Sequence, residues 1–347
     1  MTCHCFIVPL DVLKKFATDP ELEQEVRDSF LHTHAISLHI RALRAEHSAM
    51  AATIGLLPQP PQAALARVHQ LPPSQVYDCQ HGSSQPGVPV PNPASSADGT
   101  IKRAGAEATA VAKFYWDVFR RDSIDGHHMT LMSSVHYMNK FNNAFWDGTH
   151  MTYGDGDGQI FVDFTLGNDV IGHELTHGVT QNSAGFAYAN EAGGLNESMS
   201  DVFGSMFRQW QAGQDVNSAD WLIGHDIMGP VATARGYTCL RDMANPAAAH
   251  CLAPQPTNFS QYHAGMDPHS SSGIPNLAFC KAAKAAGGHS WDKIGQIWYK
   301  ALTGFAPSPQ MLMRQFANRT RTLSHKMFPT DASIQNAVNN AWLAVGL

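Results

Sequence analysis

Apolar residues recur at helical spacing near the start of the chain. Asp19-Pro20-Glu21 is a typical helix start, because it offers an N-cap carboxylate, a proline at the first helical position and an acid in the first turn. The apolar positions that follow at roughly helical spacing are Leu22, Val26, Phe30, Ile36, Ile40 and Leu43. Because a helix with one apolar side must cover that side, the pattern predicts a small helical subdomain packed on a larger fold.

The segment from Leu57 to Gly99 breaks this pattern. Its prolines stand at positions 58, 60, 61, 72, 73, 86, 89, 91 and 93. Proline ends helices and removes a backbone donor, so the segment predicts a linker or irregular structure without long helices. Backbone at the start of such a segment is expected to be exposed, and a proteolytic cut would fall there.

Beyond residue 100 the periodicity predicts two regions of different kinds. A helix is expected over 106–119, followed by short strands around 135–137 and 160–162, which the glycine-aspartate turn 154–158 separates. The remaining pattern is mostly helical, with segments at 199–211, 276–286, 291–302, 309–323 and 330–345. A β-containing lobe followed by a helical lobe predicts an α+β fold with a cleft.

Composition narrows the class of protein. At 347 residues, with 44% hydrophobic residues, the chain can form two lobes around a large core. Only 15% of the residues are charged and the net charge is -6, which gives no reason to expect nucleic acid or an anionic membrane as a partner. No stretch approaches the roughly 18 uninterrupted apolar residues that indicate a membrane-spanning helix.

The apolar run at the N-terminus does not have the pattern of a signal peptide. It lacks a basic leader, and Asp11, Lys14 and Lys15 interrupt it early. We therefore expect synthesis in the cytoplasm, with later export by another route left open.

Three cysteines lie in the second half of the chain. Cys239 and Cys251 flank a loop and either form a disulfide, if the compartment is oxidising, or remain free thiols. Cys280 lies on an apolar helical stretch with Leu277 and Phe279, so it is expected to be a core thiol.

The residues with the most specific chemistry are His173-Glu174-Leu175-Thr176-His177. Positions i and i+4 of a helix share a face, so His173 and His177 can bind one metal ion together. Glu197 follows 20 positions after the second histidine and can supply a third ligand from a second helix. Two imidazoles, one carboxylate and an open fourth position describe a catalytic zinc site, in which Glu174 can reach a metal-bound water.

The flanking residues favour this site over the alternative, an amphipathic helix with two surface histidines. Ile171, Leu175 and Val179 form an apolar stripe that buries the helix. Asn196 and Asp201, on either side of Glu197, are the hydrogen-bond acceptors that ligand histidines need on their second ring nitrogen.

Three stretches together resemble the thermolysin family of metalloproteases: Tyr153 to Gly158, Asp169 to Gln181, and Asn196 to Asp201. The resemblance runs from about Ala106 to the C-terminus, and the short N-terminal part is similar to the protealysin-like branch. The division that we expect from it is a propeptide (1–56), a Pro-rich irregular start of the mature enzyme (57–99), an N-terminal catalytic lobe with the zinc helix (100–188) and a helical C-terminal lobe (189–347).

The resemblance also implies roles for residues around the zinc. Glu174 would be the general base, and Tyr188 and His269 would donate to the oxyanion that forms beside the metal. Asp267, two residues before His269, is a candidate orienting partner of that histidine. The implied pairs of a ligand and its orienting residue are His173 with Asp201 and His177 with Asn196.

Substrate contacts follow from the same resemblance. Asn143 and the backbone of Ala144 match the strand edge that holds an extended peptide. Arg241 matches the residue that binds a substrate carbonyl. The residues that match the walls of an apolar pocket beyond the scissile bond are Val170, Ile223 and Leu240. Such a pocket predicts cleavage on the N-terminal side of Leu, Ile or Phe.

Calcium binding is expected to differ from the thermolysin pattern. Asp169 and Asp220 match its acidic cluster, but Arg208, Leu222 and His225 stand where that pattern has glutamates. Because calcium takes six to eight oxygen ligands, a double site is not expected, and a weak single site is the most that remains. The run Asp155-Gly156-Asp157-Gly158 is either a calcium loop or, as we favour, a tight turn.

These expectations combine into a zinc-dependent neutral endopeptidase, made as a precursor that its own N-terminal segment inhibits. The stretch Cys5-Phe6-Ile7-Val8-Pro9-Leu10 resembles the start of protealysin-like propeptides, and Pro9 keeps it extended and suited to lying in a peptide-binding cleft. Either Cys5, or as the less favoured candidate Cys3, reaches the zinc and replaces the water, or both are incidental surface thiols and the helix at 20–44 inhibits by coverage. The alternative functions are a latent zinc-binding protein whose cleft stays blocked and a zinc-dependent effector that acts on one partner protein.

Overall fold

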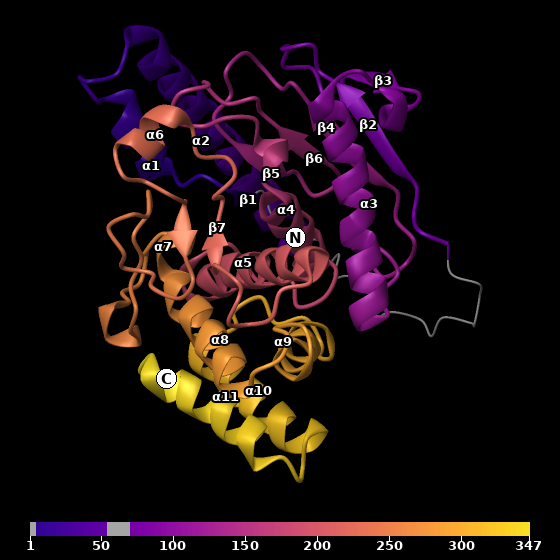
Figure 1. The fold of residues 1–347 in the computed structure, drawn as a ribbon, viewed down its shortest axis with the longest axis vertical. Coiled ribbons are helices and arrows are strands. Elements are labelled where there is room, and N and C mark those ends of the chain that lie inside the picture. Colours follow the sequence, from indigo (N-terminus) through magenta and orange to yellow (C-terminus); the bar gives the residue numbers. More distant parts are fainter. Residues whose placement is uncertain (1–4, 54–69) are drawn as a thin grey trace.

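The computed structural model describes residues 5–53 and 70–347, without the side chains of Cys5 and of residues 41–53. It consists of a sheet-containing lobe and a helical lobe (Figure 1). The lobes meet at helices α4 (Asn168–Gln181) and α5 (Asn190–Ala212), which lie side by side in the middle of the molecule. The expected α+β fold, with the histidine-bearing helix between the lobes, is confirmed.

One six-stranded sheet forms the first lobe, with strand order β1-β5-β6-β4-β2-β3. The strands are β1 (Cys5–Phe6), β2 (Ser74–Asp78), β3 (Val88–Val90), β4 (Leu131–Val135), β5 (Ala144–Trp146) and β6 (Met151–Tyr153). β2, β4 and β6 are parallel to one another, whereas β1–β5, β5–β6 and β2–β3 pair antiparallel. Helix α3 (Gly99–Phe119) packs next to β2 and β4, and the short 3-10 helix η2 (Phe164–Leu166) leads into α4.

Two predictions for this lobe need correction. The segment 57–99, expected to be irregular, contributes β2, β3 and the short 3-10 helix η1 (Pro93–Ser95). Pro89 fits inside β3 because β3 is an edge strand, where a missing N–H leaves no ladder bond unmade. The strand expected at 160–162 is a single bridge between Phe161 and Met228, and the one expected at 135–137 lies at Leu131–Val135.

The apolar positions of the N-terminal segment bury it against the sheet-containing lobe. Helices α1 (Leu10–Ala17) and α2 (Gln24–Thr53) pack on each other. The Phe16 ring lies 5.1 Å from the Phe30 ring, which in turn lies 6.0 Å from Phe161. The predicted helical subdomain is therefore confirmed over the residues that the structure describes, and aromatic contacts hold it on the larger fold.

The start of this helix differs from the prediction. α2 begins at Gln24 rather than at Pro20. The Asp19 carboxylate accepts the Glu21 N–H at 2.9 Å and also pairs with Arg235 of the other lobe. Asp19 therefore stabilises a turn that anchors the segment, instead of capping the long helix.

The second lobe is helical, as its periodicity predicted. Besides α5 its helices are α6 (Pro230–Ala234), α7 (Pro268–Ser271), α8 (Gly273–Ala286), α9 (Lys293–Thr303), α10 (Met313–Met327) and α11 (Ala332–Ala344), with the 3-10 helix η3 (Phe259–Gln261). Two short strands, β7 (Leu222–Ile223) and β8 (Arg241–Asp242), form a separate antiparallel pair. Trp298 and Trp342 stack at 5.8 Å in the core of this lobe. Among the described helices, none is long and apolar enough to span a bilayer.

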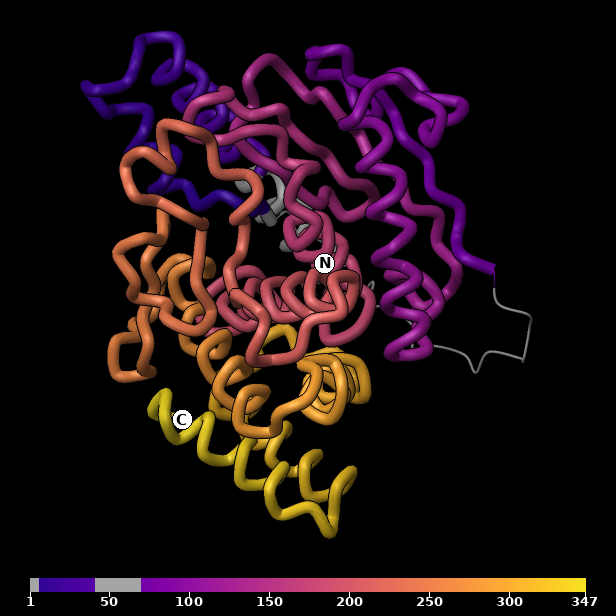
Figure 2. Tube along the Cα trace, in the orientation of Figure 1, coloured from indigo at the N-terminus to yellow at the C-terminus, as the bar shows by residue number. Residues whose placement is uncertain are grey.

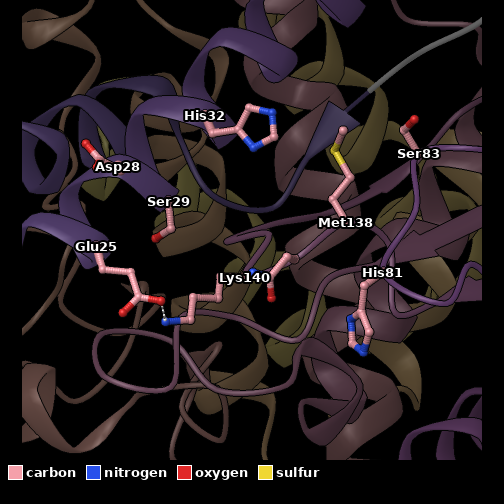
Figure 3. Close-up of a pocket in the computed structure, with 9 residues that line it drawn as sticks. Glu25, Asp28, Ser29, His32, His81, Ser83, Met138 and Lys140 are labelled. Atoms are coloured by element: carbon pink, nitrogen blue, oxygen red, sulfur yellow. Dashed lines mark hydrogen bonds and ion pairs between the residues drawn. The ribbon is translucent and has the colours of Figure 1, made fainter.

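A polar pocket opens where α2 meets two loops of the sheet-containing lobe (Figure 3). Its lining residues are Glu25, Asp28, Ser29, His32, His81, Ser83, Met138, Asn139 and Lys140. Glu25 and Lys140 form an ion pair of 2.5 Å at this junction. Because Glu25 is largely exposed, this pair contributes little to holding α2 in place, and the buried aromatic contacts dominate.

His136 joins two loops of the sheet-containing lobe to helix α3. Its Nδ1 lies 2.9 Å from Asp155 Oδ1 and its Nε2 lies 3.1 Å from Asp98 Oδ2. Asp98 also caps α3 by accepting the Thr100 N–H at 2.8 Å. The hydrogen bond with Asp155 raises the pKa of His136 to about 9, although partial burial opposes it. A histidine whose pKa is raised on folding stabilises the folded state fully below its ordinary pKa and loses that contribution as the pH rises through the folded value.

The free energy of unfolding should therefore fall between about pH 6.5 and pH 9. His136→Asn should lower the free energy of unfolding by roughly 1–2 kcal/mol at pH 6, a figure reduced from the full pKa shift because solvent screens the pair. Above pH 6 the free energy of unfolding of this variant should depend less on pH than that of the wild type. Asparagine is chosen because residue 136 has a φ of 52°, which asparagine tolerates. Denaturant titrations at pH 6, 7.5 and 9 measure this, with exposed His127→Asn as the control. Parallel profiles for the wild type and His136→Asn would contradict the assignment.

Candidate active site

Helices α4 and α5 can approach closely because residue 204 is glycine. A Cβ at position 204 would lie 2.6 Å from the carbonyl oxygen of Asp169 and 3.0 Å from the backbone nitrogen of His173. A side chain there would force the two helices apart. The close packing brings Glu197 of α5 to the two histidines of α4.

His173, His177 and Glu197 meet in the interior and are fully buried. The two Nε2 atoms are 3.1 Å apart, and oxygens of Glu197 lie 3.4 Å from His173 Nε2 and 3.6 Å from His177 Nε2. Because each Nδ1 faces an acceptor, the N–H of each neutral ring lies on that side, and both Nε2 atoms are free to offer a lone pair to a cation between them. Two facing lone pairs and a buried carboxylate fit a shared cation, and zinc binds such donors at about 2.0–2.2 Å.

Each Nδ1 atom has a buried acceptor. His173 Nδ1 lies 2.8 Å from Asp201 Oδ1, and His177 Nδ1 lies 2.9 Å from Asn196 Oδ1. Arg241 donates to both oxygens of Asp201, at 2.8 and 2.7 Å. Burial alone would raise the pKa of Asp201, but the Arg241 guanidinium and His173 hold it well below its ordinary value. Asp201 therefore stays ionised and can fix the orientation of His173.

Glu174 turns toward the sheet. It is fully buried, and its Oε2 accepts the backbone N–H of Trp146 at 3.0 Å. This hydrogen bond holds the carboxylate between the histidine-bearing helix and β5. A carboxylate in that position can accept a proton from a water molecule bound beside His173 and His177.

Tyr188 and His269 both contact Glu197. The Tyr188 hydroxyl donates to Glu197 Oε1 at 2.5 Å and lies 3.4 Å from His269 Nε2. His269 Nε2 lies 3.5 Å from Glu197 Oε2. On the other side of the ring, His269 Nδ1 lies 2.9 Å from Asp267 Oδ1, so the candidate orienting partner is within hydrogen-bond distance.

The start of the chain lies beside these side chains. β1 pairs antiparallel with β5, with Cys5 opposite Trp146 and Phe6 opposite Phe145. In Figure 2 the indigo N-terminal segment enters the middle of the molecule, next to the histidine-bearing helix, which β1 contacts. Phe6, Ile7 and Val8 are fully buried there. The strand therefore fills the edge of β5 that faces the site.

Residues 7 and 8 use the groups that the resemblance assigned to substrate binding. The Ile7 N–H donates to the Ala144 carbonyl at 3.2 Å, and Arg241 Nη1 donates to the Ile7 carbonyl at 3.0 Å. Val8 exchanges two hydrogen bonds with the Asn143 side chain, at 2.9 and 3.2 Å. All three predicted main-chain anchors are thus engaged by the chain itself.

The peptide bond between Phe6 and Ile7 lies closest to the catalytic candidates. The Phe6 carbonyl oxygen is 2.5 Å from His269 Nε2. Ile7 belongs to the same buried apolar cluster as the three residues predicted to wall the pocket, Val170, Ile223 and Leu240. The main chain of the segment therefore engages the groups expected to hold a bound peptide, and the Ile7 side chain is buried in the apolar core.

The extended conformation that Pro9 indicated for this segment is observed, whereas its pairing with β5 was not predicted. The signal was the run Phe6-Ile7-Val8, whose aromatic and β-branched residues before Pro9 are typical of a short edge strand. The hypothesis that Cys5 reaches the zinc concerns a side chain that the structure does not describe, and Cys3 also lies outside the described residues. It therefore stays a prediction. Asn276 was also missed, although its Nδ2 donates to Asp201 at 2.8 Å and completes the surroundings of that carboxylate.

A guanidinium group occupies the region that matches the acidic cluster of thermolysin. Arg208 Nη1 lies 2.5 Å from Asp226 and 3.7 Å from the buried Asp169, and its Nη2 lies 3.6 Å from Asp220. Burial would lower the pKa of Arg208, but these three carboxylates raise it instead. The arginine therefore places a positive charge among these three carboxylates and partly offsets their charge.

The glycine-aspartate run 154–158 uses its carboxylates within the protein. Asp157 accepts the backbone N–H groups of Gln159 and Ile160, both at 2.9 Å. Asp155 pairs with His136. These contacts favour the tight turn over a calcium loop.

Comparison with known proteins gives consistent matches. A family model described as the catalytic domain of thermolysin metallopeptidase matches residues 74–181, and one described as its alpha-helical domain matches residues 184–347. An extracellular metalloprotease of Pectobacterium carotovorum subsp. carotovorum is 38% identical over 285 residues, which cover 78% of this chain and 80% of that protein. Protease PrtS of a Photorhabdus species is 34% identical over 285 residues, which cover 78% and 76%.

A solved structure matches nearly the whole chain. It is the precursor of protealysin, a metalloproteinase from Serratia proteamaculans, with a TM-score of 0.82 and 32% sequence identity. The match covers 99% of each chain. Similarity therefore extends through the N-terminal segment as well as both lobes.

Proposed function

The chain belongs to the thermolysin family of metallopeptidases, and we propose that residues 5–8 hold its zinc site latent by occupying the substrate cleft. The family matches and the likeness to a precursor show a neutral metalloprotease in precursor form. The observation that carries the proposal is the hydrogen bonding of Phe6, Ile7 and Val8 to the anchors that face the histidine pair. A strand added to a sheet edge is a common mode of peptide recognition.

The buried donor set supports zinc as the resident metal. Two lone-pair Nε2 atoms and one carboxylate suit zinc better than calcium, which prefers oxygen ligands. We assign His173, His177 and Glu197 as the ligands. When bound, zinc lowers the pKa of a water molecule and polarises the substrate carbonyl. Glu174 accepts the proton of that water and delivers it to the leaving amine.

His269 and Tyr188 are proposed to stabilise the oxyanion. The Phe6 carbonyl, 2.5 Å from His269 Nε2, lies where the carbonyl of a scissile bond would lie in this register. Asp267 Oδ1, 2.9 Å from His269 Nδ1, orients the ring so that Nε2 faces this carbonyl. The Tyr188 hydroxyl, 3.4 Å from His269 Nε2, can supply a second donor once it leaves Glu197.

The calcium and domain assignments extend the proposal. We propose that no pair of calcium ions binds near the cleft, because the Arg208 guanidinium already pairs with Asp169, Asp220 and Asp226. The inhibitory propeptide is proposed as residues 1–56, with maturation by a cut near the start of the segment 57–99. That boundary falls at residues 54–69, outside the described residues.

Cleavage specificity should follow the pocket that Ile7 occupies. A peptide library digested by the mature enzyme should show Leu, Ile or Phe immediately after the cut, because an apolar pocket rejects charged side chains. Leu240→Ala should extend cleavage toward Trp and other larger residues by enlarging the pocket. Mass spectrometry of the products measures both. A preference for acidic or basic residues after the cut would rule out the pocket formed by Val170, Ile223 and Leu240.

One alternative fits the occupied cleft: a zinc-binding protein whose N-terminal strand never leaves. Intact-mass measurements over time separate the two. A protease should convert the 347-residue chain to a shorter form, and the same sample with a zinc chelator should stay whole. Hydrolysis of casein by the shorter form would also exclude an effector restricted to one partner protein. A chain that stays whole with zinc bound would favour the permanently blocked protein.

A further inference from the structure

Two buried cysteines and a histidine meet next to β8, outside the candidate active site. Cys239 and Cys251 face each other in a parallel bridge. Backbone hydrogen bonds of 3.0 Å fix this register on both sides, from the Thr238 N–H to the His250 carbonyl and from the Leu252 N–H to the Cys239 carbonyl. The two sulfurs and a ring nitrogen of His250 all lie within 4.8 Å of one another.

The spacing of the two sulfurs matches a shared metal ion better than a disulfide. The Sγ atoms are 3.8 Å apart, and both cysteines are free thiols. A disulfide needs them at about 2.05 Å. Two thiolates bound to one tetrahedral zinc at about 2.3 Å lie about 3.8 Å apart. The observed spacing is therefore already that of two ligands of one zinc ion.

The third donor is also in place. His250 Nε2 is buried and, among the described residues, makes no hydrogen bond. Asp242 Oδ2 lies 3.2 Å from this same nitrogen, a spacing that suits two ligands of one ion. The other oxygen of Asp242 is occupied, because it accepts the N–H groups of Ala244 and Asn245.

We propose that Cys239, His250 and Cys251 bind a second, structural zinc ion, with Asp242 or a water molecule at the fourth position. Zinc with two thiolates and a neutral imidazole has no net charge, which suits a buried site. Zinc binding releases both thiol protons to solvent.

The position of this site explains what the ion would do. Leu240 and Arg241 follow Cys239 directly, and Arg241 holds both Asp201 and the Ile7 carbonyl. The loop from Asp242 to His250 returns the chain to Cys251. A metal ion that joins Cys239 to His250 and Cys251 closes this loop and fixes the strand that carries Arg241.

Zinc stoichiometry tests the proposal directly. The full chain is purified with a reductant and without a chelator, and its zinc content per chain is measured by inductively coupled plasma mass spectrometry. Cys239→Ser combined with Cys251→Ser should contain one zinc ion per chain fewer than the wild type. Cys280→Ser removes another buried thiol and should match the wild type. The difference between wild type and double variant reports this site alone, whether or not His173, His177 and Glu197 bind zinc.

Cobalt substitution gives a second measurement that depends on the ligands. His173, His177 and Glu197 offer no sulfur, so a thiolate-to-cobalt charge-transfer band in the wild type should disappear in the double serine variant and persist in Cys280→Ser. If the double variant does not fold, His250→Ala keeps both thiols and should release the ion at least about tenfold more readily to a chelator. Equal zinc content in wild type and double variant would overturn the proposal. A Cys239–Cys251 disulfide in the reduced preparation, or a charge-transfer band that survives in the double variant, would also overturn it.

Discussion

Glu174→Ala is expected to reduce peptide hydrolysis by about 10³-fold or more while leaving the zinc content of the chain unchanged. Glu174 is fully buried, and its Oε2 accepts the Trp146 N–H, so the carboxylate is held in one place beside the histidine pair. Removing it removes the proton acceptor but none of the three metal donors. The loss should appear in kcat rather than in metal binding.

Three variants separate these effects. Glu174→Gln keeps an oxygen to accept the Trp146 N–H but is not basic, so it should be as inactive as Glu174→Ala and more stable. His177→Ala should lose both metal and activity, because it removes a ligand. Both glutamate variants should also remain full-length on storage. Loss of zinc from Glu174→Gln would show that the roles of base and ligand have been confused.

The helix with the two histidines could be predicted because its information is local. His173 and His177 share a face at i and i+4, and the apolar stripe between them specifies burial. Glu197 lies on a second helix, 20 positions after His177. This spacing alone did not show that the Glu197 carboxylate meets the two histidines. It lies beside the histidines because Gly204 lets α5 approach α4, a contact that only tertiary packing reveals.

The sequence indicated an extended segment suited to the cleft, but the pairing of β1 could not be predicted because its partners are distant. Val8 bonds to Asn143 across 135 positions, and Arg241 reaches Ile7 across 234. A two-residue strand has no periodicity of its own, and its register comes entirely from the edge of β5. The same holds for β2 and β3, where a Pro-rich composition concealed strands that the sheet stabilises.

Arg208 shows the opposite case, in which a departure from a family pattern was informative. Finding an arginine where glutamates are expected predicted the loss of a calcium pair. The residue that completes the arrangement, Asp226, was not identified, because it pairs with Arg208 only in the folded protein, at 2.5 Å. The sequence thus shows where a charge departs from the family pattern, whereas the fold shows which residue pairs with the new charge.

Ile7→Asp should activate the uncleaved precursor by about 100-fold. Ile7 is fully buried in the apolar cluster that includes Val170, Ile223 and Leu240. An unpaired charge in such a site costs several kcal/mol, and weakening the docking of the strand by about 3 kcal/mol raises the fraction of open cleft by about 100-fold. Helices α1 and α2 should stay attached, because Phe16 and Phe30 hold them independently.

The activation is measured as the initial rate on a small fluorogenic peptide, with intact mass confirming that the chain is uncut. Leu31→Asp is the matched control, because Leu31 lies on α2 with 59% of its surface exposed and should leave latency unchanged. Cys5→Ser tests the thiol hypothesis. If a thiolate on the zinc maintains latency, this single substitution should be enough to make the precursor active and should speed its maturation. Activation by Ile7→Asp without activation by Cys5→Ser would assign latency to the main-chain strand. If Ile7→Asp is folded and as latent as the wild type, the strand in the cleft is not the inhibitor, and coverage by α1 and α2 has to account for it.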